Sequence, residues 1–197
     1  MRLYVMRHGE SEANRDRRSS GWSQVPLTEL GMEQAKKTGE LMQGIRIDRI
    51  ITSDLLRAKQ TAELIFPGRE YTEDARLREL NVGILTGHLW AENDALYGET
   101  LKQAQSRVDY REFGGEHGDE QVARVAEFMD SLSEYPDEEN IAVVCHWGTV
   151  FSILHYVLQA PLARNHVEVA NAGVSCFTRK DGLWRMTGWN VTEKGIV

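Results

Sequence analysis

The sequence predicts an α/β fold: a three-layer sandwich with a largely parallel central sheet flanked by helices. Short apolar runs alternate with helical patterns in the N-terminal part of the chain, as expected when parallel strands are joined by helices. The run NIAVVCH at 140–146 is continuously apolar up to its final histidine, which is typical of a strand buried on both faces. Two strand-like segments flank a Lys-Asp-Gly turn at 174–190, which predicts a C-terminal β-hairpin.

The first part of the chain is expected to form strands and helices in alternation, at 3–6, 28–43, 49–52 and 54–66. The second helix carries apolar residues at helical spacing, which gives it one buried face: Leu55, Ala58, Ala62 and Ile65. Ser53 lies where it can cap this helix, and Pro67 and Gly68 end it.

The periodicity weakens at 85–118, where glycines and scattered polar residues predict an irregular helical insert. Apolar periodicity returns at 122–132 and at 150–158, so we expect a helix on each side of the 140–146 strand. No repeat or linker divides the chain, and 197 residues suit one domain that spans 1–197.

Composition limits the expected partners and location. The longest apolar run, 141–145, is far shorter than the ~20 residues of a membrane span, and the N-terminus lacks a secretory pattern, so a cytoplasmic location is expected. A net charge of -7 without a basic stripe argues against nucleic acid and anionic membranes as partners. Cys145 and Cys176 lie in apolar runs, which predicts buried free thiols rather than a disulfide.

Polar side chains appear where three of the predicted strands end. Arg7 and His8 follow the first strand, the stretch 53–57 with Arg57 follows the second, and His146 ends the apolar run at 140–146. The carboxyl ends of parallel strands face one crevice in an open α/β sheet, so these groups are expected to converge. Buried cations without a partner are costly, which predicts a site for an anion.

The helices that follow Ser53 and His146 add backbone N–H groups and positive dipole ends to the same crevice. At an effective dielectric constant near 20, each close pair of opposite unit charges contributes about 4 kcal/mol. The cationic groups of this crevice therefore suffice to hold a phosphate dianion.

Five segments of the chain resemble, in order, the motifs of the histidine phosphatase superfamily, which includes the cofactor-dependent phosphoglycerate mutases. They are RHGESEAN...SGWSQVPLTELG (7–31), SDLLRAKQTAE (53–63), LRELNVGILTG (77–87), FGGEHGDEQVARV (113–125) and VVCHWG (143–148). The common order and spacing of these segments, rather than the short RHG motif alone, carry the resemblance.

The resemblance implies a catalytic role for five residues. His8 matches the nucleophile that takes the phosphoryl group and becomes a phosphohistidine. Arg7, Arg57 and His146 match the groups that hold the phosphate oxygens, and Glu79 matches the general acid.

Further substrate contacts are expected at Asn14, Ser20, Gly21, Trp22 and Trp147. The first three fall where the family places phosphate or substrate contacts. The Trp22 loop and the insert are expected to form the mouth of the site, with candidate aromatic walls at Trp90, Tyr97, Tyr110 and Trp147.

The chemistry of these residue types fits the implied roles. Hydrolysis of a phosphate monoester needs accelerations of up to ~10²¹-fold, so charge stabilisation must dominate. Neighbouring cations lower the pKa of His8 below its ordinary value of about 6.5 and keep the imidazole nucleophilic at neutral pH. General acid catalysis by Glu79 contributes about 10²- to 10⁴-fold. The resemblance implies no metal or other cofactor, and the sequence has no HxxxH or CxxC spacing.

The strand geometry poses one difficulty for this site. Successive side chains of a strand point to opposite faces, so Arg7 and His8 cannot both enter one crevice from a regular strand. Gly9 predicts a bend there through unusual dihedral angles. By the same rule Cys145 faces the core if His146 faces the crevice, which argues against a Cys-His pair.

These observations favour a phosphomonoester hydrolase that acts on a small phosphorylated metabolite. Leu80, Asn81, Val82 and Gly83 stand where the mutases carry an Arg-x-Tyr-Gly segment that holds substrate, and the insert is shorter than in typical mutases. Phosphoglycerate mutase-type phosphotransfer is the first alternative. A non-catalytic phosphate-binding module and a metal-dependent hydrolase are the others, and the physiological substrate and oligomeric state stay open.

Overall fold

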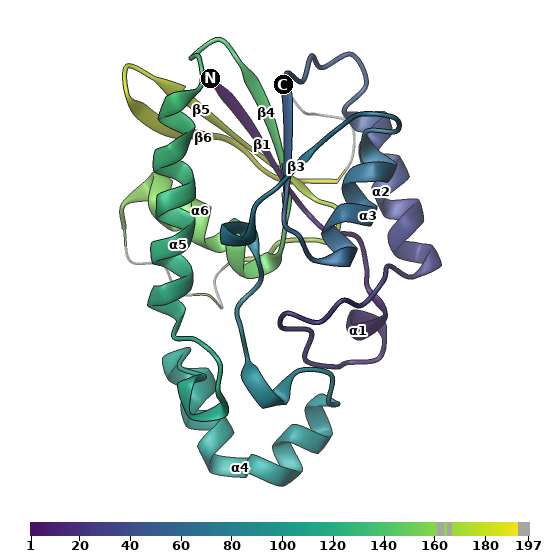
Figure 1. Cartoon of the computed structure of the whole chain (residues 1–197), viewed down its shortest axis with the longest axis vertical. Coiled ribbons are helices and arrows are strands. Elements are labelled where there is room, and N and C mark those ends of the chain that lie inside the picture. The colour runs from purple at the N-terminus through teal and green to yellow at the C-terminus, as the bar shows by residue number, and fades with distance from the viewer. Residues whose placement is uncertain (161–163, 165–166, 193–197) are drawn as a thin grey trace.

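The computed structural model describes residues 1–160, 164 and 167–192, and its centre is a mixed sheet with strand order β3-β2-β4-β1-β5-β6 (Figure 1). The parallel part consists of β1 (Arg2–Arg7), β2 (Arg49–Thr52), β3 (Thr72–Glu73) and β4 (Asn140–Cys145). β5 (Val174–Lys180) pairs antiparallel with β1 and with β6 (Leu183–Val191). The predicted α/β fold and its C-terminal hairpin are confirmed.

Helices cover both faces of this sheet (Figure 1). One layer contains α2 (Glu29–Leu41) and α3 (Leu56–Ile65), and the other contains α5 (Gly118–Ser131) and α6 (Trp147–Leu158). Shorter elements are α1 (Glu12–Arg15), η1 (Ala75–Leu77), η2 (Gly83–Leu85), η3 (Arg111–Phe113) and η4 (Leu132–Glu134).

The alternation of side chains along the central strands produces these layers. In β1, Leu3 and Val5 pack with α5 and α6, whereas Tyr4 and Met6 pack with α2 and α3. Full burial of each large apolar side chain contributes about 1.5–3 kcal/mol, so both layers are held to the strand. Cys145 of β4 belongs to the α5 and α6 side. It faces the core as expected, and Cys145 and Cys176 are both free and buried.

The insert before α5 is more regular than the sequence predicted. α4 (Trp90–Arg107) is a helix of 18 residues with a kink at Gly98, and it lies at the foot of the molecule, beyond the ends of β1 and β4 (Figure 1). Its buried residues are Asn93, Leu101 and Ala104. Because so few positions are buried, no apolar stripe marks this helix in the sequence.

The prediction that Ser53 caps α3 was wrong. The helix begins at Leu56, and its N-cap residue, Leu55, makes no side-chain capping bond. The Ser53 hydroxyl oxygen lies 2.8 Å from Nε2 of His146 instead. Ser53 therefore belongs to the crevice at the strand ends.

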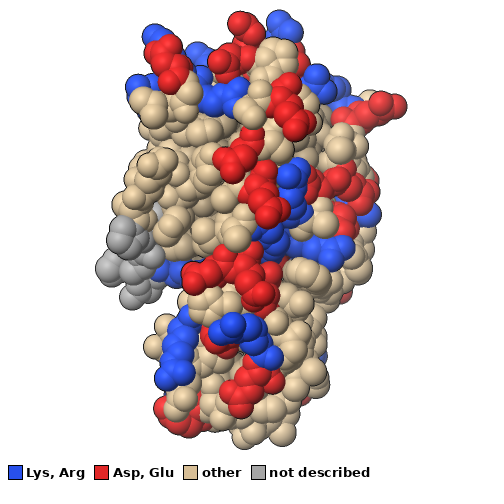
Figure 2. Space-filling model, turned by 60° about the vertical axis from the view of Figure 1, so that its left-hand side comes forward, with Lys and Arg blue, Asp and Glu red and all other residues tan. Residues whose placement is uncertain are grey.

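Figure 2 shows one face of the molecule, and its charge is mixed rather than segregated. On the face that Figure 2 presents, acidic and basic side chains are interspersed. None of the helices among the described residues combines the length and apolar character needed to cross a membrane.

Candidate active site

His8 follows the last residue of β1 and is almost completely buried, with 3% of its surface exposed. Its N–H donates to the carbonyl of Cys145 over 2.9 Å, which continues the pairing of β1 with β4. Nδ1 lies 2.6 Å from the carbonyl oxygen of Gly9. A carbonyl only accepts hydrogen bonds, so Nδ1 carries the proton and Nε2 keeps its lone pair.

Gly9 is required for a reason other than the predicted one. Its φ is not among the positive values of the chain; instead its backbone lies against Gly31, and a Cβ at Gly9 would overlap the Gly31 carbonyl. The Gly9 N–H donates to Oγ1 of Thr61 on α3 over 3.1 Å. The chain therefore leaves the sheet through close contact with α2 and α3, without left-handed backbone.

Arg57 lies in the first turn of α3 and is fully buried. Its Nε donates to Nε2 of His8 over 3.3 Å, and its Nη1 and Nη2 donate to the carbonyls of Ser23 and Gly21, each over 2.9 Å. Burial lowers the pKa of Arg57 to about 10, with a smaller raising effect from Glu79. The guanidinium is thus charged at neutral pH.

His146 and Arg7 complete the cluster around His8. His146 is the N-cap residue of α6, and its ring centroid lies 5.1 Å from that of His8. Nη1 of Arg7 donates to the carbonyl of Val169 over 2.6 Å. Within the described part of the chain, Nδ1 of His146 and Nε of Arg7 are buried without a hydrogen-bond partner. Buried polar atoms without partners are rare, so this cluster has unused hydrogen-bonding capacity.

Burial and positive charge keep both imidazoles neutral. The pKa of His8 lies well below its ordinary value, first because of burial and then because of the charges of Arg57 and Arg7. The pKa of His146 is lowered by burial and then by Arg57. At neutral pH His8 thus presents an unprotonated Nε2 beside two guanidinium groups.

Glu79 lies in an irregular segment between η1 and η2. Its Oε1 accepts from the N–H of Leu80 (2.8 Å), from the N–H of Gly148 (3.2 Å) and from the side-chain amide of Gln121 (3.3 Å). Because Gly148 lies in the first turn of α6, two residues after its N-cap His146, Glu79 faces the same helix end. A Cβ at Gly148 would overlap the Glu79 carboxyl group.

The backbone of Gly21 contributes to the cluster through Arg57, to which it supplies a carbonyl acceptor. The Ser20 carbonyl accepts from the hydroxyl of Ser23 over 2.6 Å. Asn14 forms a capping box with Ser11 at the start of α1. Among the described residues, the ring nitrogens of His8 bond to Gly9 and Arg57 and to none of these three residues.

The two predicted tryptophans have structural partners. Nε1 of Trp22 donates to the Glu79 carbonyl over 2.6 Å, and the Arg78 guanidinium lies 4.6 Å from the centroid of the Trp22 ring. Trp147 stacks on Phe151 with an angle of 9° between the rings. Trp22 thus contacts the segment that carries Glu79.

The other aromatic candidates divide into two groups. Trp90 and Tyr110 line a cavity of about 320 Å³ together with Ser19. Tyr97 packs edge-on against Phe113 within the core of the insert. Trp90 and Tyr110 thus border a cavity that Ser19 also lines, whereas the aromatic contact of Tyr97 lies within the insert. The wall role of these residues stays a prediction.

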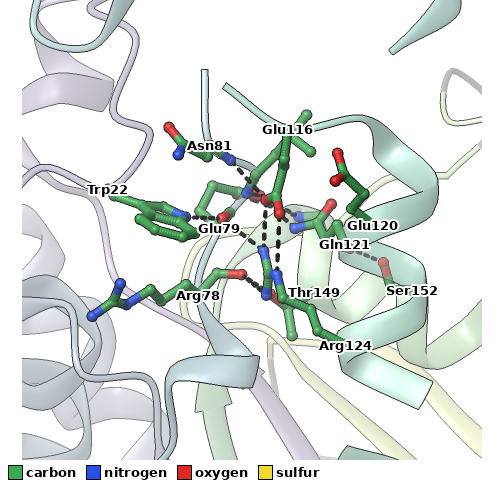
Figure 3. A network of polar contacts seen from close by, with 12 residues as sticks. Trp22, Arg78, Glu79, Asn81, Glu116, Glu120, Gln121, Arg124, Thr149 and Ser152 are labelled. Carbon is green, nitrogen blue, oxygen red and sulfur yellow. Dashed lines mark hydrogen bonds and ion pairs between the residues drawn. The ribbon is translucent and has the colours of Figure 1, made fainter. Parts of the chain in front are cut away.

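A polar network that could not be inferred from the sequence lies behind Glu79 and involves Glu116, Gln121, Arg124 and Thr149. Figure 3 shows the Arg124 guanidinium pointing from α5 toward the backbone on either side of Glu79. Glu116 and Arg124 lie within the segment FGGEHGDEQVARV, which carries part of the family resemblance. The resemblance assigned no function to these two residues.

The arrangement suits an anion held beside a nucleophilic nitrogen. It combines a neutral imidazole whose Nε2 carries no proton, the guanidinium groups of Arg7 and Arg57, and the carboxyl group of Glu79. Across the described ranges of the chain, no cluster of three or more His, Cys, Asp or Glu side chains is arranged to hold a metal ion.

Comparisons with known proteins agree with this chemistry. The family model "Histidine phosphatase superfamily (branch 1)" matches residues 3–192. A protein of Salmonella paratyphi A named "Probable phosphoglycerate mutase GpmB" is 33% identical over 204 residues, which cover 100% of this chain and 94% of that protein.

Two solved structures are similar over nearly the whole chain. The alpha-ribazole phosphatase from Shigella flexneri superposes with a TM-score of 0.90 at 27% identity and covers 100% of both chains. A mycobacterial glucosyl-3-phosphoglycerate phosphatase superposes with a TM-score of 0.82 at 28% identity, covering 96% of this chain and 98% of that one.

Proposed function

Because the chain belongs to the histidine phosphatase superfamily, we propose that it is a metal-independent phosphomonoesterase that acts through a phosphohistidine at His8. Glu79 serves as general acid and then as general base. The observation that carries the proposal is the state of His8: its Nδ1–H is bound to the Gly9 carbonyl, and its neutral Nε2 faces Arg57. The substrate class is a small phosphorylated metabolite.

In the first step the lone pair of His8 Nε2 attacks the phosphorus atom. The N–P bond forms while the ester P–O bond breaks, and the proton of the Glu79 carboxyl group passes to the leaving oxygen. Arg7 and Arg57 compensate the charge on the phosphoryl oxygens.

In the second step water attacks the phosphohistidine. The Glu79 carboxylate takes a proton from this water as the new O–P bond forms. The P–N bond breaks, its electron pair returns to Nε2 of His8, and inorganic phosphate leaves. Throughout both steps the Gly9 carbonyl holds the Nδ1 proton and the orientation of the ring.

Phosphoglycerate mutase-type transfer is the second candidate, because the relative from Salmonella paratyphi A carries that name. The residues after Glu79 favour hydrolysis. Leu80 is buried, the Asn81 side chain accepts from the N–H of Gly83 over 3.0 Å, and Val82 is apolar. These positions supply no cation for the carboxylate of a glycerate.

The proposal is tested by hydrolysis of 4-nitrophenyl phosphate in the presence of EDTA, with the parent chain and His8→Ala. The parent is expected to retain its activity, and His8→Ala to lose at least about 10³-fold in kcat. The parent should also form an acid-labile phosphoenzyme that His8→Ala does not form. Unchanged turnover by His8→Ala would refute the mechanism.

The alternatives give different results in the same experiment. Loss of activity with EDTA would indicate a metal-dependent hydrolase. Movement of phosphate between positions of a glycerate without release would indicate a mutase. Phosphate binding without turnover of any monoester would indicate a non-catalytic module.

A further inference from the structure

The segment that carries Glu79 has no regular secondary structure of its own. Residues 78–82 lie between η1 and η2 without helix or strand hydrogen bonding. A general acid must nevertheless stay within hydrogen-bond distance of the leaving oxygen. Catalytic side chains must be held to within about 0.5 Å of their productive positions. The position of Glu79 therefore depends on side chains from other elements.

The guanidinium group of Arg124 on α5 binds the backbone at the start of this segment (Figure 3). Its Nη1 donates to the carbonyls of Arg76 (2.7 Å) and Arg78 (2.8 Å), and its Nη2 donates to the carbonyl of Glu79 (2.9 Å). Nη2 and Nε also contact the Glu116 carboxylate, over 2.9 and 3.4 Å. All the N–H donors that a guanidinium offers are thus in use.

Glu116 holds the segment from the other side. Its Oε1 accepts from the N–H of Asn81 over 2.9 Å, and its own N–H donates to the Asn81 carbonyl over 3.0 Å. The Arg124 and Glu116 side chains are largely buried, with 16% and 13% exposed. The pair therefore fixes the backbone directly before and after Glu79.

The carboxyl group of Glu79 is not a partner of Arg124. The cation binds the Glu79 carbonyl, whereas Oε1 is held by neutral donors on Leu80, Gly148 and Gln121. Arg124 thus acts on the backbone of Glu79 and makes no ion pair with the carboxyl group that is proposed to donate the proton. The Glu116 carboxylate also neutralises the charge of Arg124 locally.

We propose that Arg124 and Glu116 are positioning residues that set the Glu79 carboxyl group for proton transfer, a role that rests on the proposed function of Glu79. They act through the backbone and leave the carboxyl group free to exchange its proton. Arginine is required because its planar fork reaches three carbonyls and a carboxylate at once, whereas a lysine ammonium is a point charge.

The test compares two substrates that differ in their need for a general acid. 4-Nitrophenolate leaves without a proton, whereas the alkoxide of glycerol 2-phosphate must be protonated. The ratio kcat/KM reports the steps up to phosphorylation of His8. Arg124→Lys is expected to lower kcat/KM about 10- to 100-fold for glycerol 2-phosphate. For 4-nitrophenyl phosphate the expected loss in kcat/KM is less than about 3-fold. Glu116→Gln should show the same selectivity with a smaller loss.

Three further variants make the result decisive. Arg49→Lys is the matched control. Arg49 pairs with Glu139 at the start of β2, at the opposite end of that strand from the site. This variant should leave kcat/KM unchanged for both substrates. Glu79→Gln should show the same selective loss. Arg124→Lys added to Glu79→Gln should cause no further loss with glycerol 2-phosphate, because the two residues act on one step.

The positioning role requires that Glu79→Gln loses activity mainly with glycerol 2-phosphate. If it does, and Arg124→Lys loses activity equally with both substrates or with neither, the positioning role is overturned. A Glu79→Gln variant without selectivity would refute the role of Glu79, and the positioning role with it. Thermal melts show whether each variant is folded. If Arg124→Lys does not fold, the comparison of the two substrates is made with Glu116→Gln, and the same outcomes apply.

Discussion

Nε of Arg57 donates a hydrogen bond to Nε2 of His8 over 3.3 Å. The cation that helps to lower the pKa of His8 therefore points at the atom proposed to attack phosphorus. One lone pair cannot accept this bond and attack at the same time. In the proposed mechanism an arriving phosphate oxygen takes over the Nε–H of Arg57, and this exchange releases the lone pair of His8 for attack.

This relationship predicts a large effect of Arg57→Lys. Lysine keeps the charge but loses the donor to His8 and the bonds to the carbonyls of Gly21 and Ser23. We expect kcat/KM for 4-nitrophenyl phosphate to fall about 10²- to 10³-fold, with weaker inhibition by inorganic phosphate. Arg69→Lys is the control, because Arg69 donates to the carbonyl of Ile47 away from the site. Retention of more than half of the activity would contradict the assignment.

The buried histidines predict that stability falls in acid. Folding lowers the pKa of both His8 and His146, so below their ordinary value of about 6.5 the unfolded chain binds protons that the folded chain does not. The free energy of unfolding should decrease as the pH falls through this range, by up to about 1.4 kcal/mol per pH unit for each histidine.

Urea unfolding in phosphate-free buffer measures this effect at about pH 7.5 and about pH 5.5. His146→Gln should lose less stability between the two conditions than the parent, because one buried titrating group is gone. The exposed His88 serves as control, and His88→Gln should follow the parent. Equal pH dependence of His146→Gln and the parent would disprove the neutral, buried state of His146.

The contact between Gly9 and Gly31 predicts a steric requirement. A Cβ at Gly9 would overlap the Gly31 carbonyl, and one at Gly31 would overlap the Glu10 carbonyl. Because backbone must move in either case, Gly9→Ala and Gly31→Ala should each lower the free energy of unfolding by about 1–3 kcal/mol. Gly188→Ala is the control, since a Cβ there makes ordinary contacts with Cys176. Similar melting temperatures for all three variants would exclude this requirement.

A substitution at Trp22 tests whether this residue positions Glu79 or contacts the substrate. Trp22→Phe removes the indole donor to the Glu79 carbonyl and keeps an aromatic face for Arg78. The loss of one hydrogen bond of about 1 kcal/mol should lower kcat for an alkyl phosphate several-fold and leave KM unchanged. A raised KM with unchanged kcat would show instead that Trp22 contacts the substrate, as expected from the sequence.

Much of the fold could be predicted because its signals are local. The apolar runs of β1 and β4, the stripe of α3 and the Lys-Asp-Gly turn each depend on neighbouring residues. In that turn Asp181 and Gly182 adopt φ values of 54° and 74°, as a two-residue hairpin turn requires. The convergence of His8, Arg57 and His146 followed from the rule that parallel strands end at one edge of the sheet.

By itself, then, the sequence determined the layers of the fold and the residue types at the strand ends. Only the tertiary structure decided that Gly9 serves a close approach, that Ser53 bonds to His146 rather than capping α3, and that Arg124 holds the Glu79 segment. Arg124 lies 45 residues from Glu79, and in the sequence it is an ordinary helix arginine. Such partners could not be predicted, because a long-range hydrogen bond depends on how separate elements pack, whereas periodicity reports only which face of each element is buried.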